Sequence, residues 1–423
     1  MKKVSIGILG LGTVGGGAYR ILTQNHESIL RKENLDLQVV KVLEKSPQIA
    51  IQKGVPKDKI AASIDDITSN PEIDIVVEVI GGIEPAKSFI ERCLISGKHV
   101  VTANKELISK HWRELEQIAQ KHNKGLYFEA SCLGGVPIIR SIVEGMQANN
   151  IIEIAGIFNG TTNYILTKMS EENMSYADAL AEAQKLGYAE ADPTSDVEGY
   201  DAMYKLNILS TLAFRKQIPL ESIYREGITK ITKTDIQSGK ELGYTIKLLA
   251  IARLYNNSLE VRVHPTFVPE KHPLANVRDS FNAVYLVGNY VGEIMLYGRG
   301  AGDLPTGSAI VSDIIYCAHQ DKPRYIKFDR ELNDIKLVTD FKSKYYMVLN
   351  CADKPGVLAQ TAAVLGSNQV SIDSVIQKGK HKEFARVVFL THKTSELSMK
   401  KALKELERLK VVDSIESVIR VLD

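Results

Sequence analysis

Hydrophobic and polar residues in the first third of the chain follow a pattern that predicts buried strands alternating with amphipathic helices. The apolar runs at Val4–Leu9 and Asp74–Ile80 are typical of strands that are covered on both faces. A helix at Pro85–Ser96 ends before Gly97, and a strand at His99–Val101 follows. This order predicts a parallel sheet between layers of helices, and therefore an α/β fold.

Residues 186–209 combine a turn, a group of acids and an apolar helix. Five carboxylates fall within twelve positions, namely Glu190, Asp192, Asp196, Glu198 and Asp201. Ser195 or Asp196 is the expected N-cap of the helix. Asp201 and Lys205 lie one turn apart on it, which is the spacing of an ordinary surface ion pair. The apolar flanks favour a second interpretation, a partly buried lysine that exchanges a proton with an alcohol near carboxylates that hold an ammonium group.

The last hundred or so residues show a second, separate pattern. Residues 321–342 are charged and have little periodicity, which predicts a linker. Strands and helices are then expected at Tyr345–Asn350, Val357–Gly366, Ser371–Gln377, Phe384–Leu390, Glu396–Leu409 and Ser414–Val421. That order is βαββαβ, the ferredoxin-like arrangement.

Composition narrows the class of protein. The chain has 423 residues, enough for two or three domains, and 44% of them are hydrophobic and 25% charged. The net charge is +2 without a basic stripe, which argues against a nucleic-acid partner. The four cysteines have no metal-finger spacing and are expected to be reduced thiols of a cytoplasmic protein. No apolar run is long enough for a transmembrane helix, so no membrane association is expected.

A glycine-rich turn directly follows the first strand. Gly10, Gly12 and Gly15 form a G-x-G-x-x-G motif between that strand and a helix. The three glycines would allow a tight turn, close approach of a pyrophosphate, and packing of the helix on the strand. Free N–H groups at the helix start would hold the phosphates. The sequence therefore predicts a dinucleotide site.

The end of the second strand, Gln38–Leu43, leaves the choice between NAD and NADP open. Glu44 would accept a hydrogen bond from the ribose 2′-hydroxyl of NAD, whereas Lys45 would meet the 2′-phosphate of NADP. A solvated charge pair without a role is an equal alternative.

Two further segments fall at the carboxyl ends of the predicted strands, where such sheets bind their ligands. Thr102 leads into Asn104 and Lys105, and Lys105 is either a site residue or an exposed residue at a helix start. A strand at Leu126–Glu129 runs into a glycine-rich loop. Exposed carbonyls beside a carboxylate would suit a hard cation, and an ordinary tight loop is the alternative.

Six segments resemble the homoserine dehydrogenase family. They are GLGTVGGG at 10–17, VVTANKELI at 100–108, EASCLGGVPII at 129–139, NGTTNYILTKM at 159–169, LGYAEADPTSDVEGYDAMYKLNIL at 186–209 and GRGAGDLPTGSAIVSDI at 298–314. The resemblance implies NAD(P)-dependent interconversion of L-homoserine and L-aspartate 4-semialdehyde, a step in threonine, methionine and isoleucine biosynthesis. It also implies a nucleotide-binding domain followed by a sheet domain through which chains pair.

The resemblance assigns roles to residues of this chain. Lys205 would exchange the proton with the substrate oxygen, with Asp201 and Lys105 as the other catalytic residues. The substrate would be held by Glu190, Asp196 and Asn159. The cofactor would be held by Gly10, Gly12, Thr13, Val14, Gly15, Lys45, Thr102, Lys105 and Gly302. A monovalent cation, Na⁺ or K⁺, would be bound at Glu129, Cys132, Gly134 and Val136.

Three positions depart from the commoner pattern of the family. Leu43 stands where an arginine often ends the second strand, which weakens the case for NADP. Ser195 replaces a frequent aspartate, and Cys132 replaces a small aliphatic residue. Two other classes of protein remain as alternatives, another Rossmann-type amino-acid oxidoreductase and a non-catalytic amino-acid sensor. Lys205, Asp201, Glu190 and Lys105 argue against the sensor.

The tail, with its Asp-Lys-Pro-Gly turn at 353–356, resembles an ACT domain, a module that binds small amino acids between paired copies. The resemblance implies regulation by an amino acid, most simply threonine, in a homodimer or homotetramer. A purely structural dimerisation module is the alternative. The expected domains are a Rossmann-type nucleotide domain at 1–135, completed by about 300–320, a substrate and dimerisation domain at 136–320, the linker at 321–342, and the ACT domain at 343–423.

Overall fold

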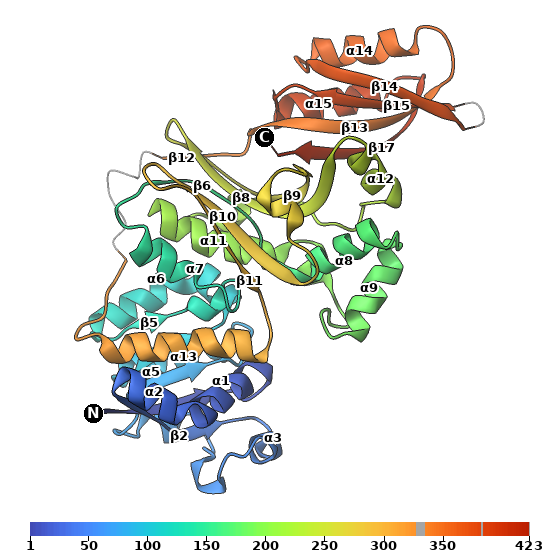
Figure 1. Ribbon diagram of the computed structural model, residues 1–423. Helices are drawn as coiled ribbons and strands as arrows, with labels where there is room; N and C mark the ends of the chain where they lie inside the picture. Colours follow the sequence, from blue (N-terminus) through green and yellow to red (C-terminus); the bar gives the residue numbers. More distant parts are fainter. Residues whose placement is uncertain (327–334, 382–383, 423) are drawn as a thin grey trace. The chain divides into compact units, whose positions relative to one another are not determined.

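The structure, a computed structural model, describes residues 1–326, 335–381 and 384–422 (Figure 1). Part of the predicted linker, residues 327–334, lies outside this range. The chain divides into two compact units, which are described separately. Unit 1 comprises residues 1–160, 201–221 and 280–335, and unit 2 comprises residues 161–200, 222–279 and 336–423.

Unit 1 begins with a five-stranded parallel sheet in the order β2-β1-β3-β4-β5. The strands are β1 (Lys2–Leu9), β2 (Leu35–Leu43), β3 (Ile75–Glu78), β4 (His99–Thr102) and β5 (Leu126–Tyr127). Every residue of β3 is buried, as expected for a strand with helices on both faces. The α/β class predicted from the hydrophobic pattern is confirmed.

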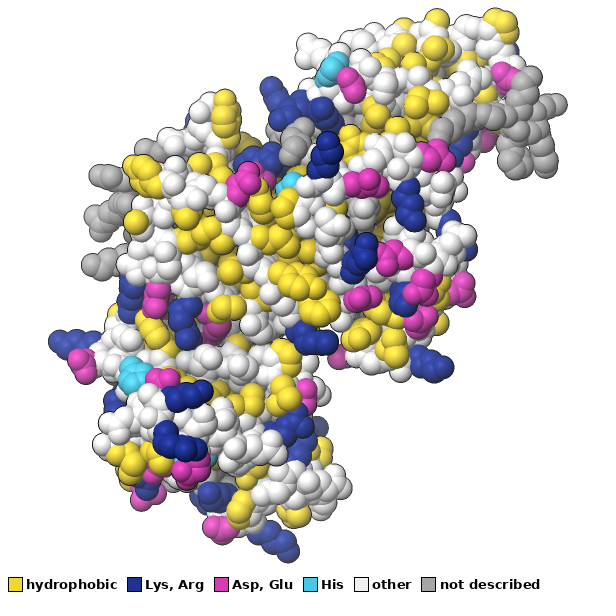
Figure 2. Space-filling model, viewed as in Figure 1, with side chains coloured by type: hydrophobic (Ala, Val, Ile, Leu, Met, Phe, Trp, Pro, Cys, Tyr) yellow, Lys and Arg dark blue, Asp and Glu magenta, His cyan; other side chains and the backbone are white. Residues whose placement is uncertain are grey.

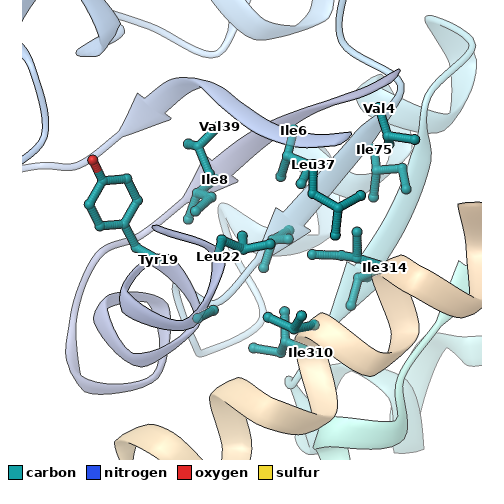
Figure 3. Packing of buried hydrophobic residues seen from close by; sticks show 14 of the residues in the cluster. Val4, Ile6, Ile8, Tyr19, Leu22, Leu37, Val39, Ile75, Ile310 and Ile314 are labelled. Carbon is teal, nitrogen blue, oxygen red and sulfur yellow. The ribbon is translucent and has the colours of Figure 1, made fainter. Parts of the chain in front are cut away.

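Helices cover both faces of this sheet. They are α1 (Thr13–Gln24), α2 (His26–Glu33), α3 (Pro47–Gln52), α4 (Asp65–Thr68), α5 (Ala86–Ile95), α6 (Lys105–Lys121) and the much later α13 (Asp303–His319). Figure 3 shows Ile310 and Ile314 of α13 beside Leu22 of α1 and Ile6 of β1, in one buried cluster. A segment that lies about 280 residues further along the chain than α1 therefore completes the core of the N-terminal sheet.

The remainder of unit 1 contains three antiparallel strands and the helix that carries Asp201 and Lys205. The strands are β6 (Ile151–Ile157), β10 (Phe281–Gly288) and β11 (Gly292–Arg299), and β10 pairs with both others. The helices are α7 (Ile138–Arg140), which continues into a π-helical turn at Ser141–Gly145, and α11 (Tyr200–Phe214). Figure 2 shows hydrophobic side chains gathered over the region of β10 and β11 on the face in view.

Unit 2 contains a second antiparallel pair of long strands, β8 (Tyr244–Tyr255) and β9 (Ser258–Pro269). Short strands β7 (Tyr224–Arg225) and β12 (Lys336–Val338) pair with β9 in parallel. The helices are α8 (Gly160–Glu171), α9 (Tyr176–Lys185), α10 (Thr194–Val197) and α12 (Lys233–Glu241). A capping box of Thr232 and Asp235 begins α12.

The C-terminal part of unit 2 confirms the predicted βαββαβ order. Its elements are β13 (Lys342–Ala352), α14 (Val357–Ser367), β14 (Ile372–His381), β15 (Phe384–Thr391), the short β16 (Thr394–Ser395), α15 (Glu396–Leu406) and β17 (Val412–Val421). The central strand β13 pairs with β15 and β17, and buried residues such as Met347 and Phe389 form its core. β17 also pairs in parallel with β9, through Arg420 with Thr266 and Val421 with Phe267.

Two predictions about local structure were wrong. The helix expected to start at Ser195 or Asp196 is two helices, because Gly199 adopts a left-handed conformation (φ +81) that interrupts the backbone between α10 and α11. The strand expected at Leu126–Glu129 ends at Tyr127, and Glu129 begins a 3-10 turn instead. Among the described residues, the structure contains no helix long and apolar enough to cross a membrane.

Candidate active site

The glycine-rich turn joins β1 to α1 in a conformation that requires its glycines. Gly10 has φ +89, a left-handed conformation that side chains disfavour. A Cβ atom on Gly15 would lie 2.2 Å from the carbonyl oxygen of Gly10. At Gly12, the N-cap of α1, a Cβ atom would meet nothing within 4 Å, so the backbone there is open to a ligand. The turn thus has the shape that places a phosphate at the start of α1.

The acidic residue at the end of β2 is tied to this turn. The Glu44 carboxylate accepts hydrogen bonds from the backbone N–H of Leu11 (2.6 Å) and of Ser46 (3.2 Å). Lys45 beside it is exposed. Lys53 adds a positive charge, since its ammonium group donates to the carbonyl of Gly12 (2.5 Å). Two carboxylate hydrogen bonds leave room for a further donor, such as a ribose hydroxyl.

The carboxyl ends of β3 and β4 are fastened together by a buried glutamate. The Thr102 hydroxyl donates to Glu78 (2.6 Å), and the backbone N–H of Asn104 donates to the same hydroxyl oxygen (3.0 Å). Burial raises the pKa of Glu78. The Asn104 side chain then accepts from the N–H of Leu107 as the N-cap of α6. These contacts fix the backbone that carries Lys105, the first residue of α6.

Lys105, Asp201 and Lys205 form one cluster of charge, in which Asp201 and Lys205 are buried. Asp201 is 3% exposed and Lys205 7% exposed, so the alternative of a solvated surface pair is wrong. One carboxylate oxygen of Asp201 lies 2.7 Å from the Lys205 ammonium nitrogen, and the other lies 2.6 Å from that of Lys105. The Lys105 side chain is 40% exposed. Two ammonium groups therefore share a single carboxylate.

Burial by itself would raise the pKa of Asp201, but the two ammonium groups outweigh it and hold this pKa well below its usual range. Asp201 is therefore a permanent anion. Lys205 donates to Asp201 and to the carbonyl of Phe158 (2.7 Å), and Asn159 donates its amide to Asp201 (2.9 Å). Within the described part of the chain, these acceptors leave one N–H of the Lys205 ammonium without a partner. That N–H is available to an oxygen atom of a ligand.

The loop that follows β5 packs behind the catalytic lysine. The Cys132 thiol lies 3.9 Å from the carbonyl oxygen of Lys205. The Glu129 carboxylate accepts from the backbone N–H of Ile139 and Arg140 at the start of α7. Burial, together with the charge of Asp313, raises the pKa of Glu129 to about 7. The carboxylate of Glu129 is therefore occupied by protein donors.

Main-chain oxygens of the same loop are better placed to meet a cation. Leu133 and Gly134 both have φ +52, and the buried residues Cys132 and Gly134 offer carbonyl oxygens. Among the described residues, no hydrogen bond reaches these two oxygens. Buried carbonyls without donors fit a hard cation such as Na⁺ or K⁺. The carbonyl of Val136 accepts from Ile138 (2.8 Å). No group of three or more histidine, cysteine or acidic side chains suits a metal ion in the described chain.

Two predicted substrate residues belong to unit 2. Glu190 is exposed on a loop that is anchored through its main chain, because the Gln184 amide donates to the Glu190 carbonyl (3.0 Å). Thr161 holds the same loop by donating to the carbonyl of Tyr188 (2.7 Å). Asp196 lies in the first turn of α10 and is half-buried. An anchored loop with an outward carboxylate is suited to contact a cationic ligand group.

Gly302 is the N-cap of α13, with φ +121. Close behind it, α13 presses against α1, since a Cβ atom on Gly17 would lie 2.0 Å from the carbonyl oxygen of Asp303. Arg20 and Asp303 form an ion pair across the two helices (2.7 Å). The start of α13 is thus held beside the helix that follows the glycine turn.

Three groups of this site were not predicted from the sequence. The Phe158 carbonyl is a main-chain group, and no residue type marks its position. Glu78 ends a buried strand, and a carboxylate at the end of an apolar run is the sequence signal that marks it. Lys53 lies 38 residues beyond Gly15, outside any local motif, and only the folded chain brings it to Gly12.

The parallel sheet with its glycine turn and adjacent lysine cluster defines a nicotinamide-dependent oxidoreductase. Family models give the particular family. Residues 10–129 match "Homoserine dehydrogenase, NAD binding domain", residues 137–315 match "Homoserine dehydrogenase" and residues 345–411 match "ACT domain".

Individual relatives cover the whole chain. A homoserine dehydrogenase of Neisseria gonorrhoeae is 42% identical over 435 residues, covering 100% of this chain and 99% of that protein. The crystal structure of a homoserine dehydrogenase from Thiobacillus denitrificans matches with a TM-score of 0.94 at 41% identity, covering 100% and 99% of the two chains. A hyperthermophilic archaeal homoserine dehydrogenase in complex with NADPH matches at a TM-score of 0.63 and 29% identity, covering 74% of this chain and 97% of that one. The chain belongs to the homoserine dehydrogenase family, and it uses a nicotinamide cofactor.

Proposed function

We propose that this chain catalyses the reversible NAD(P)-dependent interconversion of L-homoserine and L-aspartate 4-semialdehyde. The observation that carries the proposal is the buried cluster of Lys205, Asp201 and Lys105 with one unused N–H on Lys205. A reaction that interconverts an alcohol and an aldehyde needs a group that gives or takes the proton of the substrate oxygen. The cluster supplies such a group in a buried site.

The bound nicotinamide supplies the hydride chemistry. In the direction of aldehyde reduction, Lys205 donates a proton to the substrate oxygen as negative charge develops there. Asp201 fixes the Lys205 side chain by its 2.7 Å contact and stays ionised throughout. Lys105 neutralises the other oxygen of Asp201, so the cluster carries an excess of positive charge toward the substrate. Charge that is in place before the reaction stabilises the developing oxyanion.

The amino-acid part of the substrate requires opposite charges. We propose that Glu190 and Asp196 hold its ammonium group, and that Asn159 contributes from its position on Asp201. The exposed Glu190 carboxylate on an anchored loop supports this assignment. So does the amide contact of Asn159 with Asp201 (2.9 Å).

The direct test is a spectrophotometric assay of nicotinamide reduction with L-homoserine and either NAD or NADP. We expect turnover with homoserine and at least a hundredfold less with L-serine or L-threonine, whose hydroxyls are placed differently. Equal turnover with another amino-acid substrate would assign the chain to a different reaction. Absence of turnover with both cofactors would refute the proposal.

We propose that Glu44 and Lys45 set the choice between NAD and NADP, with the glycine turn, Thr13, Val14, Thr102 and Gly302 as the common part of the cofactor site. Glu44 retains acceptor capacity for a ribose hydroxyl and would repel a 2′-phosphate. The exposed Lys45 would attract that phosphate. Glu44→Ala should therefore raise the KM for NAD relative to NADP, and Lys45→Ala should do the reverse. Unchanged ratios in both variants would place the selection elsewhere.

We further propose that a monovalent cation, Na⁺ or K⁺, binds the carbonyl oxygens of the loop that contains Glu129, Cys132, Gly134 and Val136. The two buried carbonyls without donors support this site. The cation would brace the loop that contacts the main chain of Lys205. The test is thermal unfolding in KCl, NaCl and tetramethylammonium chloride at equal ionic strength. A melting temperature that is the same in all three salts would contradict the site.

For the C-terminal domain, proposed as residues 343–423 after a linker at 321–342, we propose an amino-acid effector, threonine. Its carboxylate would meet the N–H groups at the start of α14, where Gly356 has φ +85. Gly356→Val should abolish inhibition by threonine, whereas Gly366→Ala, at a helical glycine with open space around it, should not. Threonine inhibition that is equal in both variants would place the effector elsewhere.

We propose that the protein is a homodimer or homotetramer assembled through the face of β10 and β11. Phe281 and Tyr297 stack there with ring centroids 5.0 Å apart, and Tyr297 is 54% exposed. Figure 2 shows apolar side chains gathered over this region, and large apolar faces of this kind mark interfaces. Tyr297→Arg should shift the mass measured by light scattering to that of a smaller species. An unchanged mass would rule out this face.

A further inference from the structure

Unit 1 contains a cavity that the proposed cofactor and proton-transfer sites do not use, and its wall includes Glu129 of the cation loop. Its volume is about 810 Å³, within the usual range for sites that bind small molecules. Its walls come from α6, from residues 126–129, from the π-helical turn after α7, from the end of α11, from α13 and from residues 323–326. The glycine turn, Lys105 and Lys205 do not line it, so it is distinct from the cofactor and lysine sites.

Most of the charges in the cavity are matched by protein groups. Arg140 pairs with Asp313, and its guanidinium also stacks on the ring of Tyr316, 4.7 Å from the centroid. Glu129 accepts two backbone N–H groups, as described above. Glu116 accepts from the backbone N–H of Ile326 (3.0 Å). None of these groups needs a ligand to satisfy it.

Arg215 and Arg324 are different. Both residues line the cavity, and within the described residues neither guanidinium donates a hydrogen bond or forms an ion pair. Burial, and then the positive charge of Arg324, lower the pKa of Arg215, while the charge of Glu116 opposes this shift. The two arginines thus line one cavity and repel each other. Arg215 also has φ +52, a conformation that non-glycine residues rarely adopt. Glu116 is the acidic group that acts on Arg215, but no ion pair joins either guanidinium to a carboxylate within the described residues, so an anion bound by both arginines would relieve the repulsion between them.

The rest of the cavity wall is apolar and aromatic. Leu212 of α11 and Phe128 are buried, and Leu126 and Val143 are half-buried. Tyr316 and Tyr325 add ring faces. A simple inorganic anion would leave these surfaces in contact with water, whereas an anion attached to an apolar body would cover them.

We propose that this cavity is a binding site for a small organic carboxylate, whose carboxylate bridges Arg215 and Arg324 and whose apolar body lies against Phe128, Val143 and Leu212. This inference is independent of the proposed catalytic function. Arg215 directly follows α11, the helix that begins at Tyr200 and carries Asp201 and Lys205. A ligand in the cavity would therefore fix the far end of the catalytic helix and stabilise unit 1 against unfolding.

The probe is para-trifluoromethylbenzoate, followed by fluorine NMR on the full-length protein saturated with NADPH, so that the cofactor site is closed to it. The neutral para-trifluoromethylbenzamide has the same shape without the charge. We expect the benzoate to bind and the benzamide to bind at least about tenfold more weakly, because charge-assisted hydrogen bonds are lost.

Three variants locate the site. Arg324→Gln and Arg215→Gln should each weaken the benzoate at least about tenfold, whereas Arg113→Gln, which removes an exposed arginine of α6 outside the cavity wall, should leave it unchanged. Val143→Trp keeps both arginines but fills the cavity, and it should abolish binding. Thermal unfolding confirms that each variant is folded, and Arg324 is exposed enough for its variant to fold if Arg215→Gln does not.

Four outcomes would overturn the proposal. They are binding of the benzamide as tight as that of the benzoate, benzoate binding undiminished in Arg324→Gln, benzoate binding undiminished in Val143→Trp, and no binding of the benzoate at millimolar concentration. The site would be established if three results agree. Benzoate binding would be weaker in both arginine variants, absent in Val143→Trp and unchanged in Arg113→Gln.

Discussion

Two buried clusters of charge, one in each unit, differ in how completely their members are matched. In unit 1, Lys105 and Lys205 share the single carboxylate of Asp201, and one N–H of Lys205 has no partner among the described residues. In unit 2, Arg420 is surrounded by acceptors. It donates to both carboxylate oxygens of Glu396, at 3.0 and 2.7 Å, to Glu226 at 2.8 Å and to the Tyr224 hydroxyl at 2.7 Å.

The unit 2 cluster around Arg420 has further partners. The Tyr345 hydroxyl donates to Glu396 (2.6 Å), and Lys400 lies 3.3 Å from the same carboxylate. Glu396 and Glu226 balance the cations around them. Burial would raise the pKa of Glu396, but the hydrogen bond and charge of Arg420 lower it below its usual value. Complete pairing of this kind holds strands together, and it leaves no group for a ligand.

The difference shows how buried charge serves two purposes. A cluster with excess charge and an open donor is poised to act on a substrate, and its incompleteness is what makes it reactive. A complete cluster fixes the relative position of segments that are far apart in sequence, here β7, α15 and β17. Burial and ion pairing alone do not distinguish the two roles, whereas a count of unused donors does.

The largest expected effect is that of Lys205→Ala. Loss of the proton donor should lower kcat by about a hundredfold to ten-thousandfold, the usual range for general acid–base catalysis. The affinity for NADP, measured by fluorescence titration, should change little. If the variant kept more than half of the wild-type turnover, the cluster of Lys105, Asp201 and Lys205 would not be the catalytic one. Lys168→Ala, which removes a half-buried lysine of unit 2 that pairs with Glu172, is the matched control.

Arg420→Met should affect stability rather than catalysis. Removal of the guanidinium leaves two carboxylates without their counter-ion, and breaking a buried pair in this way costs about 3–5 kcal/mol. We expect urea denaturation to show a free energy of unfolding lower by that amount, with kcat of the folded protein within about twofold of wild type. Arg408→Met, at an exposed position, should change neither quantity. A large loss of kcat without a loss of stability would contradict this prediction, because it would mean that the cluster around Arg420 takes part in catalysis.

The stabilising role of the Arg420 cluster can also be tested through the pH dependence of Glu396. Because the folded-state pKa of Glu396 lies below its ordinary value of 4.5, the unfolded chain binds the proton more readily. The contribution of Glu396 is therefore complete above about pH 4.5 and is lost as the pH falls through the folded-state pKa. Glu396→Gln should be about 1–3 kcal/mol less stable than wild type at neutral pH. The difference should shrink in acid, and a difference that stays constant between neutral pH and pH 3 would contradict this account.

The smallest effect is expected at an exposed carboxylate. Glu190→Gln should raise the KM for homoserine about three- to tenfold and leave the KM for the cofactor unchanged, because an exposed ion pair contributes about 1 kcal/mol. Glu172→Gln, at another exposed glutamate of unit 2, should have no effect. Equal changes in both KM values would mean that Glu190 supports its loop rather than the substrate.

Much of this architecture could be predicted from the sequence, because the relevant patterns are local. The apolar runs at β1 and β3, the glycines at 10–15 and the βαββαβ order each depend on neighbouring residues. The Asp201–Lys205 pair could be predicted from its spacing of four residues and its apolar flanks. Lys105 could only be placed near the edge of the sheet, and its contact with Asp201 depends on folding across 96 residues.

What could not be predicted involves main-chain groups and long-range contacts. The carbonyl of Phe158 and the N–H of Leu11 carry no residue-specific signal. Gly199 lies between two segments that share one helical pattern, and its left-handed conformation becomes apparent only in the folded backbone. The closed cluster around Arg420 joins β7, α15 and β17, which are separated by up to nearly two hundred residues, as shown by its 194-residue separation from Glu226.

The parallel pairing of β17 with β9 has a consequence for how the chain is made. β9 ends at Pro269 and β17 begins at Val412, so about 140 residues must be added before β9 meets this partner. At ordinary rates of translation that interval is on the order of ten seconds. During this interval residues Thr266 and Phe267 of β9 lack their pairing partners in β17. Glu226 also lacks the guanidinium of Arg420, because that residue has not yet been synthesised. An unpaired strand edge of this kind is prone to aggregation and to chaperone capture, and synthesis of residues 412–422 supplies its partner.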